Sequence, residues 1–132
     1  LDQLAPDEAR ILRTLAEHGP QPVVHVEVRG RLGTRTGRRT LARNQGRLGP
    51  DAGCRYPERV EVYLDNLERL GLVRPATEEA ADDDAYEILS VQPSVVEALR
   101  DAREQGGRGR VVRASVGLTA LGGDFVEVCV GG

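Results

Sequence analysis

The chain has 132 residues, of which 39% are apolar and 30% charged, and its formal net charge is −3. This length fits one domain with a real hydrophobic core, and the composition is that of a soluble globular protein. Only 3% of the residues are aromatic, which argues against a carbohydrate site or a base-stacking platform, and no apolar run approaches the roughly 18 residues of a membrane span.

The cysteines indicate the compartment in which the protein is expected, and the first residue indicates whether the sequence is part of a longer protein. Cys54 and Cys129 are the two cysteines, and their wide separation fits neither a disulfide framework nor a zinc site, so a reducing cytoplasm is the expected location. No secretory signal is visible. Because the sequence begins with Leu1 rather than Met, we expect it to be one piece of a longer protein, whose remainder or a separate protein would be its partner.

The first part of the chain predicts a helix, a strand, a loop and a second helix. Pro6-Asp7-Glu8 suits a helix start, apolar residues follow at helical spacing, and Gly19-Pro20 ends the helix. Alternating valines over residues 24–28 indicate a half-buried strand. Glycines punctuate an arginine-rich loop over residues 30–37, and the spacing of apolar residues over 38–48 predicts a short helix.

The clearest helix spans residues 57–70, where Pro57 and Glu58 begin it and a leucine stripe defines its buried face. Gly71 then occupies the position of a C-terminal glycine cap. Residues 72–73 and 86–91 predict two short strands, with an acidic stretch between them.

The last part of the chain predicts a helix, a strand and a helix. Ser94 to Glu97 fits a capping box, and the helix that it starts ends at Gly106-Gly107. Residues 110–118 alternate apolar and polar side chains, as a strand does, and Thr119 suits the cap of a final helix.

These elements indicate an α+β fold. Over residues 1–91 the predicted order is helix, strand, helix, helix and two wing strands, a winged-helix-like core. Residues 92–132 form a helix-strand-helix extension that packs on this core as one compact unit. The expected core residues are Leu12, Leu15, Leu64, Leu67 and Phe125.

Charge is distributed unevenly along the chain. All basic residues are arginines apart from the two histidines, and residues 29–55 hold eight arginines and one acidic residue, whereas residues 76–87 hold six acidic residues and no basic one. Arginines of the first segment are the candidate site for a polyanion such as nucleic acid, or for an acidic partner. These candidates are Arg29, Arg31, Arg35, Arg38, Arg39, Arg43 and Arg47. The alternative is a solvated loop, or arginines that pair with acids of this chain.

Other functional motifs are absent from the sequence. The helix over 57–70 carries four acidic residues against two arginines, so it repels phosphate and is a poor DNA-reading helix. A phosphate loop needs Lys, which the chain lacks, and neither G-x-S-x-G nor H-E-x-x-H occurs. His25 and Glu27 form at most an isolated pair, and three adjacent carboxylates, Asp82–Asp84, cannot all face one cation. We therefore expect no catalytic residue, no metal site and no cofactor.

Two stretches resemble the abortive-infection alpha (Abi-alpha) family of bacterial proteins. They are Tyr63-Leu64-Asp65-Asn66-Leu67-Glu68-Arg69-Leu70-Gly71-Leu72-Val73 and Leu118-Thr119-Ala120-Leu121-Gly122-Gly123-Asp124-Phe125-Val126-Glu127-Val128-Cys129. The opening Asp7-Glu8-Ala9-Arg10-Ile11-Leu12 is also similar. The chain departs from the family pattern at Leu121 and Gly123, and the arginine-rich segment has no counterpart in it.

The resemblance implies a role in defence against phage, in which an infected cell stops growing or dies before progeny are released. It brings no catalytic residues, and members usually have a further N-terminal region. Our first hypothesis is therefore a non-catalytic binding or interaction domain of a phage-defence protein. The alternatives are a winged-helix DNA-binding transcriptional regulator and a small enzyme of unrecognised type.

Overall fold

A computed structural model describes residues 4–32, 35–76 and 83–129, with the side chains of 30–38 excepted. Helices and strands are mixed along the chain, which confirms the predicted α+β class. The elements are α1 (Pro6–His18), β1 (Gln21–Leu32), β2 (Arg35–Gln45), α2 (Leu48–Asp51), the 3-10 helix η1 (Pro57–Arg59), α3 (Val60–Arg69), β3 (Val73–Ala76), α4 (Asp83–Ser90), α5 (Pro93–Glu104), β4 (Arg108–Leu118) and α6 (Ala120–Cys129).

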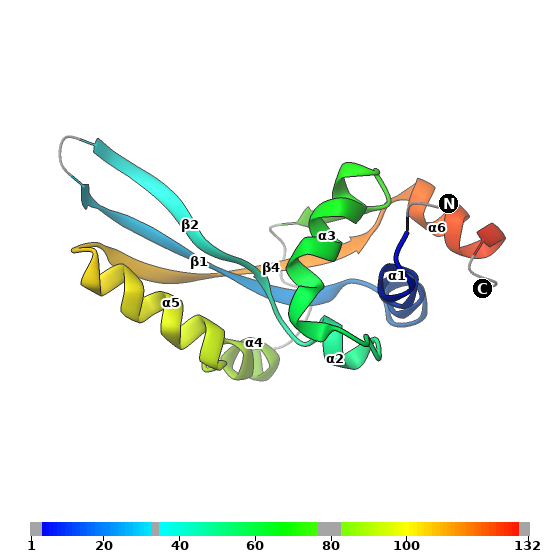
Figure 1. The fold of residues 1–132 in the computed structure, drawn as a ribbon, viewed down its shortest axis with the longest axis horizontal. Coiled ribbons are helices and arrows are strands. Elements are labelled where there is room, and N and C mark those ends of the chain that lie inside the picture. The colour runs from blue at the N-terminus through cyan, green and yellow to red at the C-terminus, as the bar shows by residue number, and fades with distance from the viewer. Residues whose placement is uncertain (1–3, 33–34, 77–82, 130–132) are drawn as a thin grey trace.

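The described strands form one antiparallel sheet in the order β2-β1-β4-β3. β1 lies in its interior and pairs with β4 from Gln21 to Arg29 and with β2 from Val24 to Leu32. In Figure 1, α5 runs along one side of this sheet, α1 and α3 lie toward one end, and the β1–β2 hairpin reaches out at the other. β4, from the predicted extension over residues 92–132, thus lies between β1 and β3 of the predicted core over 1–91. The division into these two parts stays a prediction.

One hydrophobic cluster joins α1 and α3 to one face of the sheet. Leu12 and Leu15 of α1 and Leu64 and Leu67 of α3 are buried in it, as predicted. Phe125 is only partly buried and packs against the cluster from α6. α6 lies at the end of the molecule in Figure 1.

A second cluster joins α4 and α5 to the opposite face. Val24 and Val26 of β1 pack there against Tyr86 and Val95, and all four side chains are 0% exposed. The Tyr86 hydroxyl donates a hydrogen bond of 2.7 Å to the backbone carbonyl of Ala114. A buried tyrosine hydroxyl needs such a partner, so this bond fixes α4 against β4.

The prediction of a loop and then a helix over residues 30–48 is wrong. Residues 35–45 form β2, residues 30–32 continue β1, and only Leu48–Asp51 are helical. Leu41 fits the spacing of a helix as well as that of a strand. In the structure it lies at a bulge and packs against the α4–α5 cluster from the sheet. Pairing with the long strand β1 decides the conformation of this segment, and that pairing is not visible in a local pattern.

The second predicted wing strand is also wrong, because residues 86–91 belong to α4 and the turn after it. Tyr86 and Leu89 are both buried at a helical spacing, and Asp83 and Asp84 occupy the first turn, where acidic residues favour a helix. β3 pairs with β4 instead. The predicted winged-helix order therefore differs from the order of the described elements. Most of the predicted acidic hairpin tip, residues 77–82, lies outside the described part of the chain.

In the rest of the chain α1, α3, α5, β4 and α6 lie close to their predicted bounds. The capping box predicted at Ser94 is wrong, because α5 begins at Pro93 with Gln92 as its N-cap and has no side-chain cap hydrogen bond. Thr119 caps α6 as expected: its hydroxyl accepts a 2.9 Å hydrogen bond from the Gly122 amide and donates one of 2.6 Å to the carbonyl of Gly71. A Cβ on Gly122 would overlap the carbonyl oxygen of Leu72. Glycine at this position lets α6 approach the end of α3.

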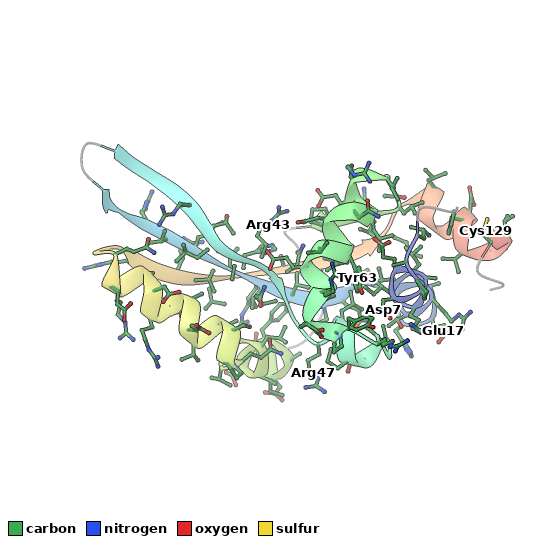
Figure 2. All side chains as sticks on the ribbon, in the orientation of Figure 1. Asp7, Glu17, Arg43, Arg47, Tyr63 and Cys129 are labelled. Carbon is green, nitrogen blue, oxygen red and sulfur yellow. The ribbon has the colours of Figure 1, made fainter. Side chains whose placement is uncertain are left out.

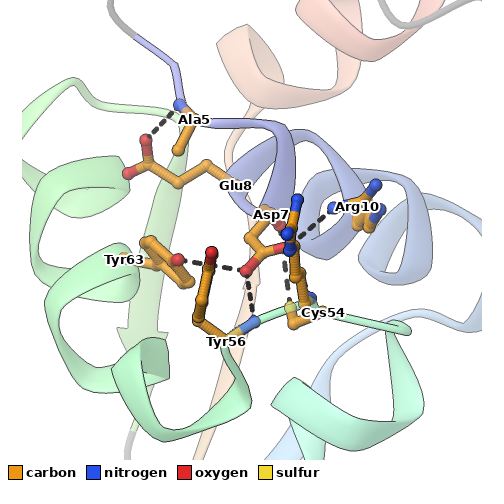
Figure 3. Close-up of polar contacts among 8 residues, drawn as sticks. Ala5, Asp7, Glu8, Arg10, Cys54, Tyr56 and Tyr63 are labelled. Atoms are coloured by element: carbon orange, nitrogen blue, oxygen red, sulfur yellow. Dashed lines mark hydrogen bonds and ion pairs between the residues drawn. The ribbon is translucent and has the colours of Figure 1, made fainter.

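A buried carboxylate, Asp7, ties α1 to the segment before α3 (Figure 3). Its side chain is 3% exposed. One oxygen accepts the Arg55 amide at 2.8 Å and the Arg10 guanidinium at 2.6 Å, and the other accepts the Tyr56 amide at 2.9 Å and the Tyr63 hydroxyl at 3.0 Å. Burial alone would raise the pKa of Asp7, but these four hydrogen bonds outweigh it and lower that pKa to about 2.

The neighbouring Glu8 makes a second tie. One of its oxygens accepts the Ala5 amide at 2.8 Å, and the other accepts the side-chain amide of Asn66 at 2.8 Å. The first bond satisfies a free amide at the start of α1, and the second joins that turn to α3. The acidic start of α1 therefore places this helix relative to α3.

We predict that Leu67→Ala lowers the free energy of unfolding by about 2–5 kcal/mol, because a core leucine is lost and a cavity remains. Chemical denaturation measures this loss. Val62 lies on the same helix and is 57% exposed, so Val62→Ala should change the free energy of unfolding by less than about 0.5 kcal/mol. A Leu67→Ala loss as small as that of the control would show that this face of α3 is not in the core.

Asp7 also predicts a specific acid sensitivity. Its pKa in the folded chain, about 2, is below the ordinary value of 3.8 for an aspartate, so its ionised form adds stability above pH 4 that is lost as the pH falls from about 4 toward 2. Asp7→Asn should lower the denaturation midpoint at pH 7, and the gap to the parent protein should narrow between pH 5 and pH 2.5. The control Asp101→Asn, at an exposed position of α5, should leave a constant difference. A gap for Asp7→Asn that is equally constant with pH would contradict the assignment.

Candidate nucleic-acid interface

The β1–β2 hairpin is longer than the sheet that supports it. β4 accompanies β1 only as far as the pair Arg29–Arg108, and residues 30–32 pair with β2 alone. In Figure 1 the outer ends of β1 and β2 turn away from the start of β4. Residues 29–47 hold seven arginines and no acidic residue, so the projecting ribbon and its base are strongly basic.

The register of β1 and β2 shifts twice at the base of this hairpin. The first shift lies between the pairs Val24–Gln45 and Val26–Ala42, where Asn44 adopts a φ of 53°, and the second lies between Val26–Ala42 and Glu27–Thr40. The Asn44 amide donates a 3.0 Å hydrogen bond to Nδ1 of His25. Such bulges increase the twist of a strand pair and change the direction of neighbouring side chains.

His25 is neutral at this position. Burial is the largest cause that lowers its pKa, the positive charge of Arg43 adds to the effect, and Glu27 opposes it. A neutral ring leaves Nδ1 free to accept the Asn44 amide. His25 therefore supports the bulge and is not a free acid or base.

The arginines at the base of the hairpin pair with acids of the same chain. A guanidinium nitrogen of Arg43 lies 3.6 Å from a carboxylate oxygen of Asp65 and another lies 3.9 Å from one of Glu68, both on α3. Arg47 lies 3.7 Å from Asp51 of α2. Figure 2 shows Arg43 beside α3 and Arg47 beside α2. These exposed pairs contribute little stability, but they offset part of the two positive charges.

The other predicted arginines occupy both strands of the hairpin. Arg29 is exposed on β1, and Arg39 donates a hydrogen bond to the Gln105 side chain at the end of α5. Arg31, Arg35 and Arg38 belong to the hairpin by their backbone pairing, and their side chains lie outside the described part of the structure. The structure thus brings the predicted candidates onto one ribbon and separates Arg43 and Arg47 at its base.

The sheet adds two arginines that the sequence analysis missed. In the register of β1 and β4, Arg108 lies opposite Arg29 and Arg110 opposite Glu27. Side chains alternate between the faces of a strand, and since Val24 and Val26 face the α4–α5 cluster, these four residues lie on the opposite face. The three arginines are exposed there. No local pattern in the sequence marks these two arginines, because only the pairing of β1 with β4 brings them beside Arg29.

A shallow hollow lies among these side chains. It has a volume of about 290 Å³ and is lined by Glu27, Arg29, Arg108, Gly109 and Arg110. We call Arg29, Arg108 and Arg110 the open arginine face. Glu27 is the acidic residue among the side chains that line this hollow, so the hollow carries a net positive charge.

α3 does not offer a basic surface. Its apolar stripe is buried in the core, and its acidic residues Asp65 and Glu68 are 50% and 41% exposed. The exposed carboxylates of Asp65 and Glu68 agree with the predicted repulsion between this helix and phosphate.

The other side chains that could take part in catalysis are poorly placed for it. Burial, and then the charge of Asp7, raise the pKa of the Cys54 thiol to about 11, so this thiol stays protonated at neutral pH. Cys129 is exposed at the end of α6. Among the described residues no group of three His, Cys, Asp or Glu side chains is arranged to hold a metal ion. None of the helices within those residues is long and apolar enough to cross a membrane.

Comparison with known proteins gives one family and one solved structure. The family model described as Abortive infection alpha matches residues 1–129. The chain is also similar to an uncharacterized protein from the hydrocarbon-degrading marine bacterium Alcanivorax borkumensis SK2, with a TM-score of 0.62 and 19% sequence identity over 98% of this chain and 89% of that one. At this identity the likeness concerns the fold alone. No curated protein matches the chain.

Proposed function

The chain belongs to the abortive infection alpha family, and we propose that it serves in abortive infection as a non-catalytic domain that binds duplex nucleic acid. The β1–β2 hairpin and the open arginine face contact the phosphate backbone. The observation that carries this proposal is the register of β1 and β4, which adds Arg108 and Arg110 to Arg29 beside the basic hairpin.

The form of the hairpin suits a duplex. A two-stranded β ribbon fits the major groove of a nucleic-acid duplex, and arginine guanidinium groups match the geometry of phosphate oxygens. The four aromatic residues, Tyr56, Tyr63, Tyr86 and Phe125, all lie outside the hairpin and β4. A surface without aromatic side chains has no platform on which unpaired bases stack. Contact with phosphates, independent of sequence, is the expected mode of binding.

The titratable groups support a role without catalysis. Cys54 stays protonated because the pKa of its thiol is raised to about 11, and His25 uses Nδ1 to hold the Asn44 amide. Neither is arranged as a nucleophile or a general base. The abundant arginines are the groups best suited to bind a ligand.

The alternative of a winged-helix transcriptional regulator has less support. Such a protein reads bases with a helix in the major groove, whereas the exposed acids of α3 repel phosphate and attract Arg43. The open arginine face could also hold an acidic protein surface. The experiment below distinguishes that ligand from nucleic acid.

We predict that the protein binds a duplex with an affinity that falls steeply with salt. Fluorescence anisotropy of a labelled duplex of about 20 base pairs, measured across salt concentrations, gives the slope of log affinity against log salt. Each phosphate contact contributes about 0.9 to this slope, so Arg108→Ala/Arg110→Ala should reduce it by about 1.8 and weaken binding to all sequences alike.

The matched control is Arg100→Ala/Arg103→Ala, which removes the same charge from exposed positions of α5. It should change the slope much less, because α5 covers the opposite face of the sheet. Equal effects of the two double variants would contradict a localised site. A duplex that does not bind even at low salt, or sequence-specific binding that Glu61→Ala/Asp65→Ala abolishes, would overturn the proposal.

A further inference from the structure

A second cationic site lies away from the hairpin, at the junction of α1, the segment before α3, and α3. A cleft of about 430 Å³ opens there, and its polar lining consists of Asp7, Arg10, Arg55, Tyr56, Arg59 and Tyr63. Figure 3 shows Asp7 between Arg10, Tyr56 and Tyr63. The volume is within the range of small-molecule sites.

The charges in this cleft do not cancel. It contains three guanidinium groups and one carboxylate, and the carboxylate of Asp7 is already bound to Arg10, to two backbone amides and to the Tyr63 hydroxyl. Within the described part of the chain, Arg55 and Arg59 have no ion-pair partner. Both are exposed, and they remain the available cations at this site.

The two available arginines are held on an anchored segment. The hydrogen bonds from the Arg55 and Tyr56 amides to Asp7, at 2.8 and 2.9 Å, fix the backbone from which Arg55 projects. The Arg55 guanidinium lies 5.5 Å from the centre of the Tyr56 ring, a distance at which a cation and an aromatic face attract one another. Because this backbone is already ordered, less conformational entropy is lost when a ligand binds.

We propose that this cleft binds the phosphate group of a small phosphomonoester. Arg55 and Arg59 hold the phosphate oxygens, and the ion pair of Arg10 with Asp7 limits repulsion between that carboxylate and the ligand. A phosphate dianion presents three acceptor oxygens, which suits several converging guanidinium groups better than a single planar carboxylate does. Tyr56, which is 45% exposed, offers an apolar ring edge to the organic part of the ligand. This site is independent of the nucleic-acid face.

Isothermal titration calorimetry of the whole chain with AMP and with inorganic phosphate tests the proposal. Both should bind, and adenosine, which lacks the phosphate, should not. Arg55→Ala/Arg59→Ala should weaken binding of AMP at least tenfold, since two charge-assisted hydrogen-bonding groups are removed. The control Arg100→Ala, at an exposed position of α5, should bind as the parent does.

Three results would overturn the proposal: AMP and phosphate that fail to bind, binding that the double variant leaves unchanged, or malonate bound as tightly as phosphate. Thermal unfolding checks that the double variant is folded, and Arg55→Gln/Arg59→Gln replaces it if it is not. Arg108→Ala/Arg110→Ala should leave AMP binding unchanged, so the failure of this site is distinguishable from failure of the nucleic-acid face.

Discussion

The pairing of β1 on both of its edges is the constraint on which the rest of this molecule depends. Its first half is covered on both faces of the sheet, by the α1–α3 cluster and by the α4–α5 cluster. Its last residues, 30–32, continue past β4 and pair with β2 alone. The same strand therefore organises the core and supports the projecting hairpin, and its register with β4 determines which arginines stand beside Arg29.

The arginines on and beside the hairpin fall into two groups according to their position. At the base, Arg43 and Arg47 lie near carboxylates of α3 and α2, so their charges help to seat the hairpin on the core. Farther out, Arg29 stands with Arg108 and Arg110 on an uncovered face. A weakly acidic chain can in this way present a basic surface to a polyanion, because the field near the surface depends on local charge rather than on net charge.

Local patterns in the sequence were enough to predict the elements in which buried residues recur at a regular spacing. The apolar stripes of α1, α3 and α5 and the alternation in β4 each identify an element without knowledge of its neighbours. β2 was missed because its conformation depends on its pairing with β1, and because Leu41, which lies at a bulge, also fits helical spacing. α4 was missed because the strand-favouring residues Tyr86, Ile88 and Val91 fall within so short a run. Arg108 and Arg110 joined the site only through β1–β4 pairing, which no local signal contains.

The central claim is that the hairpin and the open arginine face, and not α3, contact nucleic acid. NMR titration of the isotope-labelled chain with an unlabelled duplex tests it most directly, because backbone amide signals report contact residue by residue. We expect the largest shifts at residues 27–32, 35–40 and 108–112, and small shifts along α3. Shifts concentrated on the exposed side of α3, with the hairpin and β4 unaffected, would contradict it.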